Sequence, residues 1–332
     1  LCMRNTIYLE TGSADPYYNL AFEEFILCNR PEGDYLLLWQ NHNTVVVGRN
    51  QNTEAEINRA FVQLHHINVV RRTTGGGAVY HDMGNLNYSF ITDAGDAEQI
   101  SMERFTRPVV YALRGLGLDA EASGRNDILV SGRKVSGTAQ RLHKNRILHH
   151  GTLLFDSDPR MIAGALNAAP EKFSSKGAKS VRSRVGNIRS FLPVDMALAQ
   201  FWKYLKRHLC ENGFETGRIG KRERRRINRL KREKYDTWEW NYGKSPKYDM
   251  MNKKRWQGGG IEVRAQIEDG RIKDIVFYGD FLSSRPLEDI TSQMEGCPLH
   301  REAVSEVLCR FELNEYFGGI SLQELLDTIL CT

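Results

Sequence analysis

Three consecutive glycines, Gly75, Gly76 and Gly77, constrain this chain more than any other feature. They follow residues 67–70, an apolar stretch that we expect to be a strand, and two arginines, Arg71 and Arg72. Glycine has no Cβ, so the backbone N–H groups of such a loop can approach a ligand closely. The spacing matches neither the dinucleotide fingerprint nor the P-loop. Taken alone, the glycines favour a flexible turn between strands.

The segments around this loop predict a largely antiparallel sheet flanked by helices. Asp15 and Pro16 are expected to start a helix, with Glu23 and Glu24 facing outward. Residues 35–39 and 44–47 predict a hairpin, because turn-forming residues separate two apolar runs. Thr53 and Glu56 form a capping box ahead of one further helix. More strands are expected at residues 85–91, 127–130, 135–140 and 147–155, and more helices at residues 101–116, 161–166 and 194–210.

A basic run at residues 218–234 marks the predicted end of the main domain. Ten cations there stand against only Glu223 and Glu233. Beyond the run, residues 261–267 and 272–278 are joined across Asp269 and Gly270, a strong hairpin signal, and amphipathic helices follow. We therefore predict an α+β main domain over residues 1–236 and a small α+β domain over residues 237–332.

Composition excludes several classes of protein. The chain has 41% apolar residues and a net charge of +5, and it contains no run approaching the roughly 18 apolar residues of a membrane span. The six cysteines form no C-x-x-C pair, and adjacent histidines on a strand face opposite ways, so no structural metal is predicted. The clustered cations of the basic run could bind nucleic acid. A solvated linker or a surface helix is the favoured interpretation. A third interpretation is that the run attracts the acidic surface of a partner protein.

Three more polar segments follow the glycine loop. Residues 124–141, GRNDILVSGRKVSGTAQR, place Lys134 at the start of a strand, where its point charge suits a phosphate or a developing oxyanion. Residues 149–155, HHGTLLF, include His150, which we interpret as structural. Residues 176–188, KGAKSVRSRVGNI, are rich in cations and hydroxyls. Taken singly, Lys134 reads as a solvated surface residue and residues 176–188 as a solvated loop.

Together and in this order, the four segments resemble the lipoate-protein ligase and lipoyltransferase family, whose members share a fold with biotin protein ligases. RRTTGGGAVYHDMGNLNYSF is similar to that family's lipoate-binding loop nearly throughout, with Thr74 where many members have serine. The resemblance continues through WEWN at residues 238–241, so it covers almost the whole chain. In that region and the basic run, the chain resembles the animal mitochondrial lipoyltransferases.

The resemblance implies a site for lipoyl-AMP, with Lys134 as the catalytic residue that contacts its carbonyl and phosphate oxygens. Apolar strand residues would enclose the lipoyl tail. The residues that would line the site are Arg71, Arg72, Gly75, Gly76, Gly77, Tyr80, His81, Asn126, Asp127, Gly137, His150, Gly151, Thr152, Ser180, Val181, Arg182 and Ser183.

The reaction that this resemblance implies moves the lipoyl group from lipoyl-AMP to a lysine of a partner protein, by direct amine attack and release of AMP. Related octanoyltransferases use a cysteine thiolate, but no cysteine lies between Cys28 and Cys210, the interval that contains all four segments. A thioester intermediate is therefore disfavoured. Two alternatives stay open: a complete ligase that makes lipoyl-AMP from lipoate, ATP and Mg²⁺, and a transferase that uses a lipoylated carrier protein.

The implied partners are the lipoyl domains of 2-oxoacid dehydrogenase E2 subunits and the glycine cleavage H protein. We expect a monomer that binds neither nucleic acid nor membranes. The first residue, Leu1, fits a chain trimmed by processing. With the family resemblance, it leads us to expect a location in the mitochondrial matrix.

Overall fold

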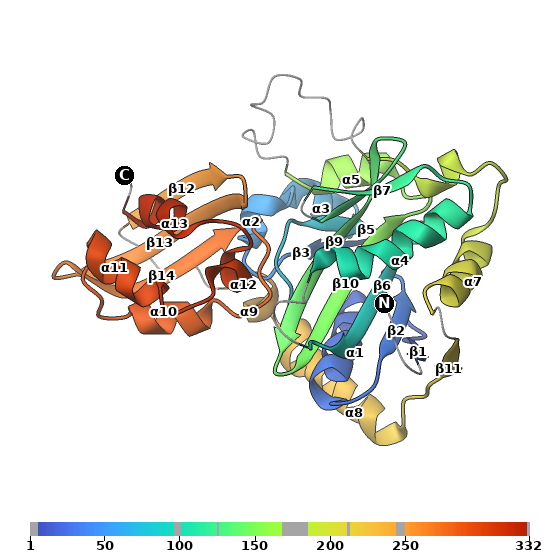
Figure 1. Cartoon of the computed structure of the whole chain (residues 1–332), viewed down its shortest axis with the longest axis horizontal. Helices are drawn as coiled ribbons and strands as arrows, with labels where there is room; N and C mark the ends of the chain where they lie inside the picture. Colours follow the sequence, from blue (N-terminus) through green and yellow to red (C-terminus); the bar gives the residue numbers. More distant parts are fainter. Residues whose placement is uncertain are drawn as a thin grey trace.

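The computed structural model describes residues 6–95, 101–124, 126–167, 185–210, 213–243 and 250–330. Figure 1 shows a larger body built around a long sheet, and beside it a smaller body formed by the chain from residue 250 onward. None of the described helices is long and apolar enough to cross a membrane.

The larger body is centred on an eight-stranded sheet. From β2 to β7 every neighbouring pair is antiparallel, whereas β1 is parallel to both β2 and β11. The predicted α+β fold with a largely antiparallel sheet is confirmed. In spatial order, the strands are β11 (Phe214–Thr216), β1 (Thr6–Glu10), β2 (Tyr35–Trp39), β6 (Asn85–Asp93), β10 (Arg146–Leu154), β9 (Arg133–His143), β8 (Asp127–Val130) and β7 (Ala120–Ser123).

A three-stranded sheet carries the glycine loop. β3 (Thr44–Val47) lies between β4 (Asn68–Arg71), to which it is parallel, and β5 (Val79–His81), to which it is antiparallel. The predicted hairpin of residues 35–39 and 44–47 is therefore wrong, because β2 and β3 belong to different sheets. The asparagines between them redirect the chain: Asn43 has a positive φ of 40° and donates to the carbonyls of His65 and His66.

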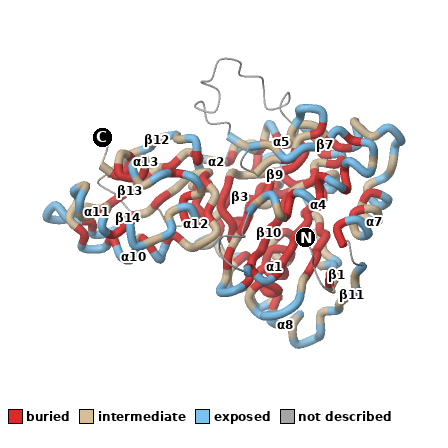
Figure 2. The backbone as a smooth tube through the Cα atoms, viewed as in Figure 1, coloured by how far each residue is buried: buried red, intermediate tan, exposed pale blue. Residues whose placement is uncertain are grey.

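Helices cover both faces of the large sheet. On one face α4 (Met102–Gly115) and α7 (Leu198–His208) bury Phe105 and Phe201 against the strands. On the other face lies α1 (Pro16–Asn29), which begins as predicted, with the Asp15 carboxylate accepting from the backbone N–H groups of Tyr17 and Tyr18. Figure 2 shows the buried residues running along the strands between these layers.

The capping box at Thr53 does not form. Residues 53–64 make two short helices, α2 (Thr53–Glu56) and α3 (Arg59–Leu64), and α5 (Pro159–Ala165) packs against α3. The Thr53 hydroxyl instead donates to the carbonyl of Asn241, which lies 188 residues further along the chain. A tertiary hydrogen bond has thus replaced the local cap.

The basic run forms α8 (Lys221–Leu230), followed by a π-helical turn η4 (Lys231–Tyr235) and by α9 (Trp238–Asn241). It packs on α1, where the buried side chains of Ile227 and Tyr235 join the core. Most of its arginines are exposed. The run is thus a surface helix anchored by a few apolar residues.

The smaller body has its own hydrophobic core. Its hairpin is formed as predicted, with positive φ at both turn residues, 51° at Asp269 and 71° at Gly270, as a type I′ turn requires. Its strands are β12 (Met250–Trp256), β13 (Gly259–Glu268) and β14 (Arg271–Gly279), and its helices are α10 (Glu288–Met294), α11 (Arg301–Leu308), α12 (Leu313–Phe317) and α13 (Leu322–Ile329).

Candidate active site

One pocket, of about 120 Å³, lies where the glycine loop and β5 meet β9 and β10. Its lining combines apolar side chains with polar ones, and some of the polar ones, such as Arg72, His81 and Asn87, are buried. It brings together segments that lie up to 132 residues apart in the sequence, namely Leu20, Trp39, Val46, Arg72, Gly77, Ala78, Val79, His81, Asn87, Asn126, Lys134, Gly137, Thr138, Ala139, His150, Gly151 and Thr152. The glycine loop, GRND, KVSG and HHGT segments therefore do converge.

Some predicted site residues lie outside this lining. Arg71 and Arg72 point to opposite sides of the strand, as neighbouring strand residues do. The Arg71 guanidinium is buried on the far side, where it donates to the carbonyls of Gly48 at 2.8 Å, Gln51 at 2.7 Å and Trp240 at 2.9 Å. Arg71 thus ties α9 to β4 and the loop after β3.

Gly75 and Gly76 face the smaller body of the protein. Their N–H groups donate to the carbonyls of Ser283 at 3.3 Å and Phe281 at 3.0 Å. A Cβ on Gly75 would lie 2.5 Å from the backbone nitrogen of Ser283. In this structure the glycines therefore permit a close approach of another backbone, where the sequence suggested a ligand.

Several other predicted site residues also lie outside the pocket lining. Tyr80 turns away from the pocket, and its hydroxyl donates to Asn43 at 2.9 Å. Asp127 stands beside the lining, in contact with Lys134. Ser180, Val181, Arg182 and Ser183 lie outside the described residues.

A chain of hydrogen bonds runs behind the pocket from Arg72 to helix α1. Arg72 Nε donates to the Thr74 hydroxyl at 3.0 Å, and that hydroxyl lies 2.8 Å from His150 Nε2. His150 Nδ1 lies 2.9 Å from the Glu23 carboxylate. Because a carboxylate only accepts, the network assigns a proton to His150 Nδ1.

Glu23 also accepts from the Ser89 hydroxyl at 2.6 Å, and Ser89 accepts from Trp39 Nε1 at 2.9 Å. The side chain of Glu23 is only 2% exposed. The expectation that Glu23 and Glu24 face outward is therefore wrong. Their charge predicted that both side chains face the solvent. Each is instead buried and bonded to polar side chains that lie far away in the sequence.

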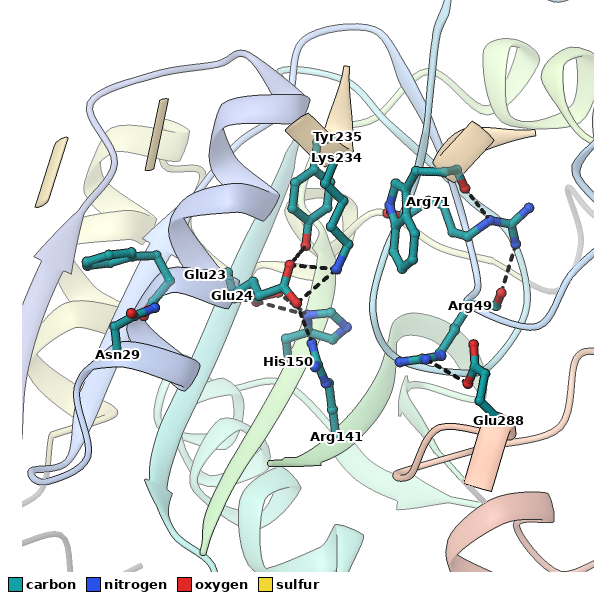
Figure 3. A network of polar contacts seen from close by, with 12 residues as sticks. Glu23, Glu24, Asn29, Arg49, Arg71, Arg141, His150, Lys234, Tyr235 and Glu288 are labelled. Carbon is teal, nitrogen blue, oxygen red and sulfur yellow. Dashed lines mark hydrogen bonds and ion pairs between the residues drawn. The ribbon is translucent and has the colours of Figure 1, made fainter. Parts of the chain in front are cut away.

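Glu24 lies at the centre of a separate cluster (Figure 3). Its carboxylate accepts from Lys234 Nζ at 2.8 Å, Arg141 at 2.9 Å and the Tyr235 hydroxyl at 2.8 Å. Burial alone would raise the pKa of Glu24, but the charges and hydrogen bonds of Lys234 and Arg141 outweigh it and lower the pKa to about 2. The cluster joins α1, β9 and the π-helical turn next to the active-site strands.

His81 supplies a neutral donor in the pocket wall. Burial, with further contributions from Arg72 and His150, lowers its pKa to about 3. Its Nδ1 accepts from the Asn41 amide at 3.1 Å, so the proton belongs on Nε2. That nitrogen has no hydrogen-bond partner within the described part of the chain.

Lys134 lines the pocket from the start of β9. Its Nζ lies 2.7 Å from the Asp127 carboxylate, and the two side chains are 38% and 32% exposed. Nearby, the N–H of Gly137 donates to the Thr152 hydroxyl at 3.3 Å. A Cβ on Gly151 would lie 2.5 Å from the Tyr88 hydroxyl, so this position requires glycine. The arrangement places a half-exposed ammonium beside an apolar cavity.

The sequence did not single out Leu20, Trp39, Asn87 or Glu23. The only sequence signal for a buried Glu23 was its place in a helix rich in apolar residues. The same signal is expected for a glutamate on the solvent-facing side of such a helix. Across the described ranges there is no group of three or more His, Cys, Asp or Glu residues placed to hold a metal ion.

Both parts of the chain match known protein families. Residues 15–210 match the lipoyl protein ligase A/B catalytic domain, and residues 245–329 match the bacterial lipoate protein ligase C-terminus. A lipoate-protein ligase of Bacillus subtilis is 42% identical over 325 residues, which cover 95% of this chain and 97% of the relative. Lipoate–protein ligase 1 of Staphylococcus aureus is 41% identical over 314 residues, with 94% and 96% covered.

Solved structures agree with these matches. Plasmodium falciparum LipL1 in complex with lipoate shares the fold, with a TM-score of 0.84 at 23% identity, covering 99% of this chain and 100% of its own. A bi-partite lipoate protein ligase of Thermoplasma acidophilum, studied with its E2 lipoyl domain, gives 0.64 at 32% identity, with 74% and 99% covered. A lipoate-protein ligase A bound with ATP gives 0.63 at 28% identity, with 73% and 99% covered.

These relatives correct two expectations. The similarity is to bacterial lipoate-protein ligases and is not specific to the animal mitochondrial transferases. The expected location in the mitochondrial matrix is contradicted, because the two full-length relatives at 41–42% identity come from bacteria, which have no mitochondria.

Proposed function

This chain belongs to the lipoate-protein ligase family, and we propose that it is a complete ligase, which makes lipoyl-AMP from lipoate and ATP before transferring the lipoyl group. The enzymatic transfer of lipoyl groups to proteins follows from the family. The activation step is supported by relatives of about the same length that are named ligases, and by the related ligase bound with ATP.

The observation that carries the proposal is that the partly exposed Lys134 lines the same pocket as several apolar side chains. Leu20, Trp39, Val46 and Val79 provide contacts for an acyl chain and its dithiolane ring. In the same lining, the ammonium of Lys134 supplies a positive charge for carbonyl and phosphate oxygens. A molecule with an apolar acyl chain and an anionic phosphate, as lipoyl-AMP is, fits these two kinds of group.

In the transfer step, the acceptor amine attacks the carbonyl carbon of the mixed anhydride and AMP leaves. Lys134 stabilises the negative charge that develops on oxygen, and the rigid pocket holds the carbonyl in place. A thioester route is not proposed. None of the described cysteines lines the pocket, and burial raises the pKa of the Cys210 thiol to about 11, which disfavours the thiolate.

The proposed acceptors are lipoyl domains of 2-oxoacid dehydrogenase E2 subunits and the glycine cleavage H protein, modified by a monomer of this chain. The related ligase studied with its E2 lipoyl domain supports the first of these. Mg²⁺ would arrive with the phosphates of ATP, and no structural metal is proposed. We also propose the division into a catalytic domain over residues 1–236 and an accessory domain over residues 237–332.

The second candidate is a transferase that uses only preformed lipoyl-AMP, since both enzymes need the same pocket. The experiment gives the protein either lipoate with ATP and Mg²⁺ or synthetic lipoyl-AMP, together with an E2 lipoyl domain. A complete ligase releases pyrophosphate in the first reaction and lipoylates the domain in both. Lipoylation from lipoyl-AMP alone would favour the transferase, and no lipoylation in either reaction would refute the proposal.

A further inference from the structure

We propose that Asp127 is a catalytic residue of the transfer step, which receives the ammonium group of the acceptor lysine and accepts its proton. This inference rests on the proposed function and assigns one further role within the same site. It follows from the position of Asp127 beside Lys134 and from the need of the acceptor ammonium to lose a proton before it can attack.

The transfer needs a proton acceptor. A free lysine amine has a pKa of about 10.4, so at neutral pH almost every acceptor side chain arrives as ammonium, which has no lone pair for attack. In the balanced step the nitrogen loses a proton and its lone pair forms the C–N bond. The bond between the carbonyl carbon and the phosphate oxygen breaks, and AMP leaves with that electron pair. A base at the mouth of the pocket would assist this step.

Asp127 is placed to be that base. It is the first residue of β8, its register partner is Gly137 of β9, and its carboxylate lies 2.7 Å from Lys134 Nζ. Its side chain is 32% exposed, although Oδ1, the oxygen that faces Lys134, is itself buried, so an acceptor from solution would approach the other carboxylate oxygen. It therefore stands beside the cation that we expect to contact the reacting carbonyl.

The other carboxylates near the site are occupied elsewhere. No Asp or Glu is among the described residues that line the pocket. Glu23 is buried behind His150 and accepts from it, and Glu24 is held by Lys234 and Arg141. Asp82, which follows β5, accepts from the backbone N–H groups of Gly84 and Asp158.

The ion pair between Asp127 and Lys134 is suited to an exchange of partners. Half-exposed pairs contribute little to stability, so separating the two groups costs little. When lipoyl-AMP is bound, its carbonyl and phosphate oxygens draw the Lys134 ammonium toward the donor. Asp127 is then an unpaired carboxylate next to the reacting carbon, and it attracts the acceptor ammonium. One carboxylate thereby serves Lys134 before the donor binds and the acceptor lysine afterwards.

The test compares two nucleophiles on the same enzyme-bound lipoyl-AMP, in single turnover with enzyme in excess. An E2 lipoyl domain presents a lysine ammonium that must lose a proton. Hydroxylamine is already uncharged at neutral pH and needs no carboxylate. In the full-length Asp127→Asn variant we expect transfer to the lipoyl domain to fall by roughly a hundredfold or more, while hydroxamate formation stays close to the wild-type rate.

Two further variants serve as controls. Asp93→Asn removes a carboxylate that pairs with Arg146 at 2.7 Å, at the end of β10 far from Thr152, and should leave both rates unchanged. Asp127→Glu keeps the carboxylate and should restore part of the transfer to the lipoyl domain.

Equal transfer rates in Asp127→Asn and wild type would overturn the inference. So would an equal loss of both reactions, because Asp127 would then act on the donor or on folding. These outcomes are distinct from a failure of the proposed function, in which the wild-type protein itself would transfer nothing from lipoyl-AMP to the lipoyl domain.

Discussion

Replacing Glu24 by glutamine should destabilise the protein strongly at neutral pH. The ion pairs of Glu24 lower its pKa from an ordinary value of 4.5 to about 2. Since one pKa unit corresponds to about 1.36 kcal/mol, the ionised form contributes about 3 kcal/mol to the free energy of unfolding. Glutamine keeps the shape but leaves Lys234 and Arg141 without an anion, so the expected loss is about 3 kcal/mol at pH 7.

The sign of the pH dependence follows from the direction of this shift. A carboxyl group whose pKa is lowered by folding stabilises the folded state above its unfolded pKa, here near 4.5, and loses that contribution as the pH falls through about 2. The difference between wild type and Glu24→Gln should therefore shrink from about 3 kcal/mol at pH 7 to roughly 1 kcal/mol at pH 3.

Urea unfolding at several pH values between 3 and 7 measures this difference. The control is Glu233→Gln, which removes a carboxylate from an exposed pair with Arg229 on the same basic segment. It should change stability by less than about 0.5 kcal/mol at every pH. A loss below about 1 kcal/mol for Glu24→Gln at pH 7, or a loss of the same size at pH 3, would refute the reasoning.

Three other substitutions test the site. Lys134→Ala should slow single-turnover transfer from saturating lipoyl-AMP by about a hundredfold to a thousandfold; transfer at the wild-type rate would exclude the proposed role. Gly75→Ala places a Cβ 2.5 Å from the Ser283 nitrogen and should raise amide hydrogen exchange around Ser283, with unchanged exchange contradicting the observed contact. Glu23→Ala leaves His150 without its carboxylate partner, so lipoate affinity should fall by about tenfold or more, and an unchanged dissociation constant would show that the hydrogen-bond chain does not shape the pocket.

Much of the fold was predictable because its signals are local. Asp15 caps α1 through backbone N–H groups only two and three residues away. Asp269 and Gly270 form their turn because aspartate and glycine tolerate positive φ. Such features depend only on residues that are neighbours along the chain, so the sequence alone contains the information that predicts them.

The predicted hairpin and capping box failed for the opposite reason. β2 and β3 each pair with strands from other parts of the chain, and the Thr53 hydroxyl bonds to Asn241. A local pattern shows that a segment suits a strand or a helix cap. It carries no information about a distant partner whose contact is more favourable than the local one.

The sequence by itself determined the segments of the candidate site, from the glycine loop through Lys134 to Thr152, because their order and spacing are characteristic of one family. Only the tertiary structure decided what each side chain does there. It turned Arg72 toward the pocket and Arg71 away, and it buried Glu23 against His150. Opposite faces of a strand and contacts between residues more than a hundred positions apart exist only once the chain has folded, which is why these roles emerge from packing.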